Sequence, residues 1–255
     1  MKGIVLSGGL GTRLHPLTIS CSKQLLPIYD KPMIYYPIST LINMGIKEIL
    51  LICKKIDLKN FYSLLGNGNE FGIKIIYEIQ DQPKGIAESF LIGEKFIKND
   101  KITLILGDNI FHGLDYKNYD RKKSTIFLYE VPDPQNYGVA TIKKERVIKI
   151  EEKPKNPKSN LIVTGLYIYN NEVIRVAKKI KPSKRNELEI TDINNYFIKK
   201  NTMTFKKFGE GSLWLDAGNP ESLFRASEYV KIIQERQQTL IGSPHYSAFK
   251  NNLIS

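Results

Sequence analysis

A glycine-rich segment near the N-terminus has the composition of a phosphate-binding loop. Residues 8–14 read GGLGTRL and follow a short apolar run. Glycines let the backbone approach a ligand closely, and their successive N–H groups can surround an anion. The Arg13 guanidinium adds a charged fork that matches phosphate geometry. No P-loop follows, and Leu14 stands where a dinucleotide fingerprint needs a small residue. A tight glycine turn beside an incidental arginine is therefore the alternative.

One lysine and two aspartates suit the same chemistry. Lys23 lies in the apolar segment SKQLLP, within reach of the glycine loop, where it can place a mobile positive charge on a phosphate. Asp108 and Asp216 each follow an apolar run, and two carboxylates at strand ends can share a Mg²⁺ ion. The alternatives are a solvated lysine and two aspartates that form turns beside glycine.

Composition excludes several other classes of protein. The chain has 255 residues, of which 42% are hydrophobic and 25% charged, as in ordinary globular proteins. Its apolar runs are too short to span a membrane, and the N-terminal run is too short for a signal peptide. The two cysteines, Cys21 and Cys53, cannot form a disulfide framework, and the three histidines lack metal-ligand spacing. We therefore expect a soluble protein of the cytoplasm.

A formal net charge of +12 raises the question of nucleic-acid binding. The lysines are dispersed along the chain and form no run of five, and no stripe of arginines and aromatic residues accompanies them. An anionic small substrate suits this charge better than a duplex or an RNA.

Strand-like and helix-like segments alternate in the first part of the chain. Strands are expected at residues 2–7, 48–53, 73–78 and 102–107, and helices at 32–44, 58–65 and 86–96. This alternation predicts an α/β fold with a mostly parallel central sheet flanked by helices. Ligands of such sheets bind beyond the carboxyl ends of the strands, where the glycine loop and Asp108 fall.

After Gly113 the pattern changes to closely spaced strands. They are expected at 124–131, 139–142, 147–151 and 166–169, followed by helices at 172–179 and 191–200 and a strand near 204–207. Strands without intervening helices predict a small antiparallel portion. Asn219 and Pro220 should begin a long helix that ends near residue 238, and the tail 242–255 shows no clear periodicity. No repeat or clean boundary divides the chain.

Eight segments, in order along the chain, resemble a single family. They are GGLGTRL (8–14), SKQLLPIYDKPMIYYP (22–37), GDNIFHG (107–113), NYGV (136–139), EEKP (151–154), VTGLY (163–167), ELEITDIN (187–194) and WLD (214–216). By these segments the chain is similar to the glucose-1-phosphate thymidylyltransferases of the sugar-nucleotide pyrophosphorylase superfamily.

The resemblance implies a Rossmann-like nucleotidyltransferase fold and a reaction. Glucose 1-phosphate would attack the α-phosphorus of dTTP in line, giving dTDP-glucose and pyrophosphate with Mg²⁺ as cofactor, at the first step of dTDP-rhamnose and other deoxysugar biosynthesis. It also implies one domain over 1–255, with a nucleotide-binding part (1–113), a sugar-binding part (114–218) and a C-terminal helix and tail (219–255). A homo-oligomer, dimer or tetramer, is expected.

The resemblance also implies residue roles. Arg13, Lys23 and Asp108 would be catalytic, and Asp108 and Asp216 would hold the metal. The nucleotide would be bound by these three catalytic residues together with Leu6, Gly8, Gly9, Gly11, Thr12, Gln24, Gln80 and Gly85. Gln80 would hydrogen-bond the thymine edge. The sugar phosphate would contact Asn109, Tyr137, Gly138, Glu152, Lys153, Val163 and Tyr167, with Glu152 on sugar hydroxyls and Lys153 on the phosphate.

Some features depart from the family pattern. Ser7, Leu10 and Ala217 replace residues that are common in the family. Residues 114–123 form a shorter segment than expected, and the sequence ends at Ser255, before the family's last helices. Because both regions contribute to the regulatory site of longer relatives, we expect catalysis to survive and feedback control to weaken.

Two alternatives of different kinds stay open at this point. A pyrimidine pocket discriminates a methyl group by only about 1–3 kcal/mol, so the nucleotide could instead be UTP or CTP. A non-catalytic nucleotide-sugar sensor with the same fold is the second alternative, although Arg13, Lys23, Asp108 and Asp216 are all present.

Overall fold

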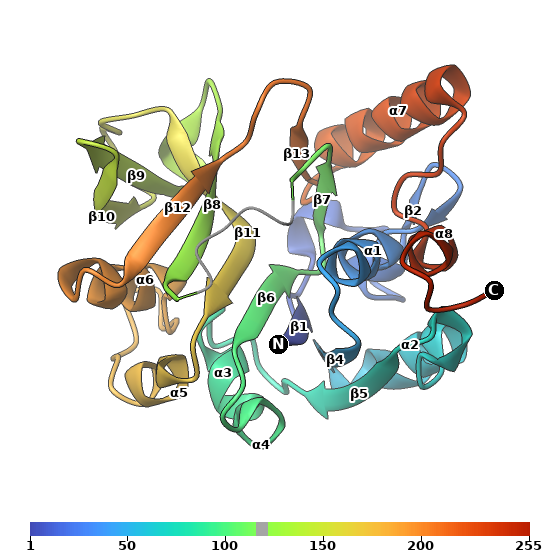
Figure 1. The fold of residues 1–255 in the computed structure, drawn as a ribbon, viewed down its shortest axis with the longest axis horizontal. Coiled ribbons are helices and arrows are strands. Elements are labelled where there is room, and N and C mark those ends of the chain that lie inside the picture. Colours follow the sequence, from blue (N-terminus) through green and yellow to red (C-terminus); the bar gives the residue numbers. More distant parts are fainter. Residues whose placement is uncertain (116–121) are drawn as a thin grey trace. The chain divides into compact units, whose positions relative to one another are not determined.

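The computed structural model describes residues 1–115 and 122–255, and these form two compact units (Figure 1). The glycine-loop unit contains residues 2–83, 105–115 and 211–255. The antiparallel unit contains Met1 and residues 84–104 and 122–210. The expected segment 114–123 lies mostly outside the described residues. The expected parts 1–113 and 114–218 differ from these units, because residues 84–104 group with the second unit and 211–218 with the first.

Parallel strands form the centre of the glycine-loop unit. β1 (Lys2–Ser7), β4 (Glu48–Cys53) and β5 (Lys74–Ile79) lie side by side, with β4 in the middle. The side chains of residues 49–53 in β4 are fully buried, as a continuous apolar run predicts for a strand covered on both faces. α1 (Tyr35–Asn43) and α2 (Leu58–Leu65) also belong to this unit. The predictions for β1, β4 and α2 are confirmed to the residue.

Two short strand pairs and two helices complete this unit. β7 (Asn109–His112) pairs with β13 (Leu213–Asp216), and β2 (Pro27–Ile28) pairs with β3 (Lys31–Pro32), both antiparallel. α7 (Pro220–Gln237) begins, as predicted, at an Asn219 cap, and α8 (Pro244–Lys250) follows it. Their shared core is apolar and includes Ile28, Met33, Tyr36, Ile110, Ala217, Ala226, Val230 and Ile241.

The antiparallel unit has the predicted antiparallel strands. β8 (Ser124–Glu130), β9 (Gly138–Lys143), β10 (Arg146–Glu152), β11 (Leu161–Tyr169) and β12 (Met203–Lys207) follow the order β10-β9-β11-β8-β12. β12 pairs with β8 in parallel, and the other pairs are antiparallel. Its helices are α3 (Glu88–Ile92), α4 (Glu94–Ile97), α5 (Glu172–Ala177) and α6 (Ile190–Lys199). β6 (Ile102–Leu106) begins in this unit and ends in the other.

Several expectations about elements were wrong in detail, among them the strand expected at 166–169, which begins at Leu161 as β11. The helix expected from Pro32 begins at Tyr35, because Pro32 pairs with Pro27 and the Met33 N–H donates to the Leu26 carbonyl. The helix expected over 86–96 divides at Gly93 into α3 and α4. The tail expected to be irregular contains α8, whose N-cap is Ser243, and the Ser243 hydroxyl accepts the Tyr246 N–H.

Single 3₁₀ turns connect several of these elements. They are Thr12–Leu14, Lys23–Leu25, Lys55–Asp57, Asn69–Phe71 and Pro134–Asn136. Within the described part of the chain, no helix combines the length and apolar character that crossing a membrane would require.

Candidate active site

The glycine loop leaves β1 and is anchored so that its polar side chains face solvent. Gly11 adopts a left-handed conformation with φ +67°, which glycine tolerates without a Cβ clash. Its carbonyl accepts hydrogen bonds from the Leu14 N–H at 2.9 Å and the Thr18 hydroxyl at 2.8 Å. Leu14 is fully buried, whereas Thr12 and Arg13 are exposed. The loop therefore offers backbone, a hydroxyl and a guanidinium to an anion.

Gln80 packs directly against the start of this loop. It follows β5, is 3% exposed, and its N–H donates to the Cys53 carbonyl at 2.9 Å. A Cβ built on Gly8 would overlap the Gln80 side-chain carbonyl oxygen. A Cβ on Gly9 would lie 3.9 Å from Lys23 Cε. The tertiary fold thus brings together the loop, an amide and a lysine that are far apart in sequence.

Lys23 and Asp108 form an ion pair at the centre of the site. The Lys23 ammonium bonds Asp108 Oδ2, and the Asn109 amide donates to Asp108 Oδ1 at 3.2 Å. Both side chains of the pair are 12% exposed. Burial raises the pKa of the Asp108 carboxyl, but the Lys23 charge and the hydrogen bonds to the carboxylate outweigh burial, and the pKa lies below its usual value. Asp108 is therefore an anion at neutral pH.

Asp216 reaches the same region on the neighbouring strand. In the β7–β13 pair Asp216 stands opposite Asn109, and the Ala217 N–H donates to the Asp108 carbonyl at 3.1 Å. A Cβ on Gly218 would lie 2.7 Å from Arg13 Nη2 and 3.0 Å from Asp216 Oδ1. The side chains of Arg13 and Asp216 therefore both lie against Gly218, where a larger residue would collide with them.

This donor set fits a magnesium ion. The described residues contain no group of three or more His, Cys, Asp or Glu side chains that could hold a metal alone. Mg²⁺ usually takes only one or two protein carboxylates, and water and substrate phosphates complete its octahedron. Asp216 ends β13 and Asp108 immediately precedes β7, the strand paired with it, so the two aspartates supply that number of carboxylates, and their role in holding Mg²⁺ stays a prediction.

The other expected nucleotide contacts are mostly buried groups that pack the site. The Leu6 carbonyl accepts the Gly107 N–H at 2.9 Å, and Gln24 is 2% exposed with its side-chain oxygen bonded by the Ser22 hydroxyl. Asn109 is also buried, and its side-chain oxygen accepts the Trp214 indole N–H at 2.6 Å. Its expected sugar-phosphate contact stays a prediction, and its visible role is to hold Asp108.

Glu152 lies at the centre of the expected sugar site in the antiparallel unit. It ends β10 opposite Gly138, and its Oε2 accepts the Thr191 hydroxyl at 2.6 Å. The Lys153 N–H donates to the Tyr137 carbonyl at 3.0 Å, and the positive φ of Lys153 turns the chain there. Burial and the Glu152 charge raise the pKa of the Tyr167 phenol, which therefore stays a hydrogen-bond donor.

Gly85 and Val163 belong to the same unit. Gly85 has φ +101°, and a Cβ there would overlap the backbone of Leu188. Lys84 and Leu188 are joined by a 2.7 Å backbone hydrogen bond, so Gly85 lies against the ELEITDIN segment. Val163 pairs with Leu128 on β8, next to a register shift in β11. Their roles toward a nucleotide or a sugar stay predictions.

Arg185 is a residue that the sequence patterns did not single out. Its Nη2 lies 3.4 Å from Glu152 Oε1, 3.3 Å from Glu187 Oε2 and 2.8 Å from Glu189 Oε2. Three carboxylates surround this guanidinium, and one of them is the expected sugar ligand. Its position two residues before ELEITDIN was the available signal.

The ion pair of Asp108 with Lys23 predicts how the stability of the fold depends on pH. A carboxyl whose pKa is lower in the folded than in the unfolded state stabilises the fold above the unfolded pKa, near 3.8, and loses this contribution as pH falls through the folded pKa. We expect the stability difference between the wild type and Asp108→Asn to be constant above about pH 5 and to shrink below about pH 4. Urea unfolding at several pH values measures it, and a difference that grows on acidification would contradict the assignment.

Known proteins resemble this chain over most or all of its length. Residues 2–232 match the family model described as nucleotidyl transferase. A glucose-1-phosphate thymidylyltransferase of Neisseria meningitidis is 45% identical over 262 residues, covering 100% of this chain and 91% of the relative. The enzyme of that name from Mycolicibacterium smegmatis is 44% identical, with 100% and 90% coverage.

Solved structures of other proteins share the fold of this chain. A Bacillus anthracis protein assigned as a glucose-1-phosphate thymidylyltransferase, solved with a sucrose, is 42% identical with a TM-score of 0.84, covering 90% of this chain and 94% of that one. UDP-glucose pyrophosphorylase in complex with UDP-glucose has a TM-score of 0.81 at 24% identity, which shows a shared fold. The chain therefore belongs to the nucleotidyl transferase family, with the glucose-1-phosphate thymidylyltransferases.

Proposed function

We propose that this chain transfers the thymidylyl group of dTTP to α-D-glucose 1-phosphate, releasing dTDP-glucose and pyrophosphate. The observation that carries the proposal is the 45% identity to an enzyme of that name over the whole chain. The partly buried Lys23–Asp108 pair beside a glycine loop supports it, because phosphoryl transfer needs mainly positioning and charge neutralisation. No general base is required, since the attacking phosphate is already an anion at neutral pH.

The glycine-loop unit would hold the triphosphate. Loop N–H groups and the Thr12 hydroxyl would bind phosphate oxygens, and Arg13 and Lys23 would offset their charge. Asp108 and Asp216 would hold Mg²⁺, which supplies further neutralisation of the phosphates. Because Lys23 is held in place by Asp108, its ammonium is positioned before substrate arrives.

The antiparallel unit would hold glucose 1-phosphate. Glu152 would accept hydrogen bonds from sugar hydroxyls, and the Tyr167 phenol is a buried donor near that carboxylate. Lys153 and Arg185 would pair with the phosphate. Arg185 already pairs with Glu152, Glu187 and Glu189, so an incoming phosphate would bind a guanidinium that three carboxylates hold in place.

Gln80 would select the base, and its contact with Gly8 gives a test. The Gly8→Ala methyl would overlap the side-chain oxygen of Gln80 and lie 3.3 Å from its Cβ, so the amide must move. We expect Gly8→Ala to raise the KM for dTTP as Gln80→Ala does. The double variant should add little to either change, because both remove the same contact. If the increases in the KM for dTTP add up in the double variant, the two substitutions do not act through the same Gly8–Gln80 contact.

The decisive experiment is pyrophosphate release from glucose 1-phosphate with dTTP, UTP or CTP in turn. A preference for dTTP supports the proposal. Preferential use of UTP or CTP would assign another nucleotide to the same fold, and absence of turnover with every triphosphate would favour a binding protein.

Three accompanying expectations belong to the same proposal. They are action in the cytoplasm, a dimeric or tetrameric homo-oligomer, and a place at the start of deoxysugar synthesis, including dTDP-rhamnose. Duplex or RNA binding is not part of it. Light scattering of the purified chain tests the oligomer.

A further inference from the structure

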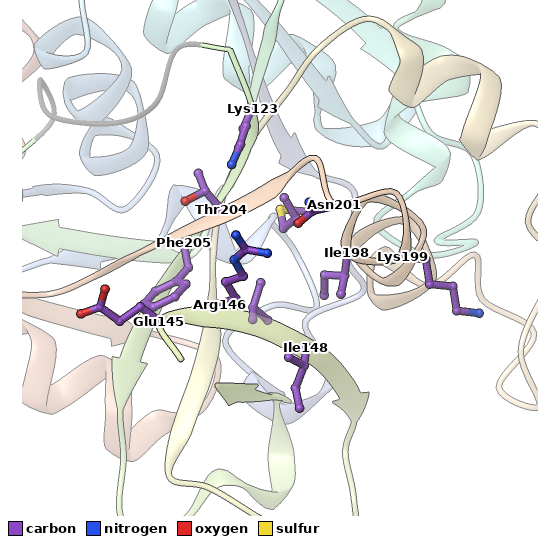
Figure 2. A pocket seen from close by; sticks show the side chains of 11 residues that line it. Lys123, Glu145, Arg146, Ile148, Ile198, Lys199, Asn201, Thr204 and Phe205 are labelled. Carbon is purple, nitrogen blue, oxygen red and sulfur yellow. The ribbon is translucent and has the colours of Figure 1, made fainter. Parts of the chain in front are cut away.

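A cavity lies within the antiparallel unit, between β10, β12 and the end of α6. Its volume is about 430 Å³, within the range of small-molecule sites. Lys123 and Arg146 both line this cavity, together with Thr204 and Asn201, and Figure 2 shows their nitrogen atoms on either side of β12 in this view. Glu145, the acidic residue of the lining, points away from it.

These two cations of the lining have no anionic partner among residues 1–115 and 122–255. Among the described residues, neither Lys123 nor Arg146 forms an ion pair or a side-chain hydrogen bond. By contrast, Lys149, Lys200 and Lys207 nearby all pair with a glutamate. Two unpaired cations that share a cavity with a hydroxyl and an amide form a suitable site for a phosphate group.

The remainder of the cavity is apolar. Val147 and Met203 line it and are only 7% and 8% exposed, and Ile198 continues this wall. An inorganic anion would leave this surface uncovered. A ligand with a phosphate at one end and a carbon skeleton at the other would satisfy both parts.

We propose that this cavity binds a small organic phosphomonoester. Its phosphate is bound by Lys123 and Arg146, and its organic part covers Val147 and Met203. The cavity is separate from the expected sugar site, which lies at the other end of β10.

Methionine methyl signals can report on this cavity independently of activity. The chain has four methionines, and Met203 alone among them lines the cavity. In the full chain labelled with ¹³C-methyl methionine, the Met203 signal is assigned from Met203→Leu. We expect phenyl phosphate to shift this signal saturably and to leave those of Met1, Met33 and Met44 in place.

Charge removal provides the matched control. The Lys123→Gln/Arg146→Gln double variant should bind phenyl phosphate at least about tenfold more weakly. Lys179→Gln removes an exposed lysine outside the cavity and should bind like the wild type. An unshifted Met203 signal, or equal binding by the double variant, would overturn the site. Equal affinity for inorganic phosphate would overturn the organic part of the ligand.

The same two elements connect this cavity to Glu152. β10 runs from Arg146 in the cavity to Glu152, and α6 runs from Thr191 to its cavity end at Lys199. Between these ends Asn195 exchanges two hydrogen bonds with the backbone of Ile150, at 3.0 and 2.8 Å. A ligand that moves either element therefore moves the Glu152–Thr191 contact.

This link rests on the proposed function and is tested separately from binding. Phenyl phosphate should change the KM for glucose 1-phosphate by about fivefold in the wild type and not in the double variant, with the KM for dTTP unchanged. If the Met203 signal shifts but the KM for glucose 1-phosphate does not change, the coupling to Glu152 is refuted and the proposed binding site still stands. Absence of any turnover would instead refute the proposed function, which the methyl signals do not measure.

Discussion

Asp108→Asn is expected to lower kcat by at least about 100-fold while the chain remains folded. The substitution keeps the shape of the side chain and removes its charge. Lys23 then loses the anion that holds it in place, and the proposed Mg²⁺ loses one of its two carboxylates. Initial rates of pyrophosphate release measure the loss, and circular dichroism checks the fold.

Several controls separate charge from structure in this prediction. Asp133→Asn removes an exposed carboxylate that has no part in the site, and its activity should match the wild type. Asp216→Asn removes the second carboxylate and should behave like Asp108→Asn, which keeps the test useful if the first variant is unstable. EDTA should abolish turnover, and added Mg²⁺ should restore it. Undiminished activity in EDTA would refute the metal assignment.

Glu152→Gln is expected to lower kcat/KM for glucose 1-phosphate by about 10- to 100-fold, with the KM for dTTP unchanged. Hydrogen bonds to a charged group contribute about 1.5–3 kcal/mol, and about 1.4 kcal/mol corresponds to a factor of ten. The amide also leaves Arg185 with one fewer carboxylate. Steady-state kinetics with each substrate varied in turn separates the two effects.

The adjacent residue supplies the matched control for this prediction. Glu151 precedes Glu152 on β10, so its side chain points to the opposite face, where it pairs with Lys149. Glu151→Gln should leave both KM values within about twofold of the wild type, since surface pairs contribute little. Equal losses in the two variants would point to a general weakening of β10 rather than to a sugar contact.

The pattern of apolar residues was sufficient to predict most elements. β1, β4 and α2 begin and end where expected, because buried parallel strands and amphipathic helices have distinct periodicities. The capped start of α7 was also predictable, since Asn219 and Pro220 are local signals. Elements of a few residues, such as β7 and α8, were not, because segments that short carry too little pattern and depend on the surfaces they contact.

Residue types and order along the chain were likewise sufficient to identify the family and the candidate catalytic side chains. Only the tertiary structure shows that Lys23 pairs with Asp108 across 85 positions, that Gln80 rests on Gly8, and that Arg185 lies beside Glu152. The same holds for the cavity, whose two cations come from β10 and from the residue before β8. Local propensity depends on neighbouring residues, whereas charge pairing and close packing depend on which distant segments the folded sheet brings together, and that is why these contacts had to be observed.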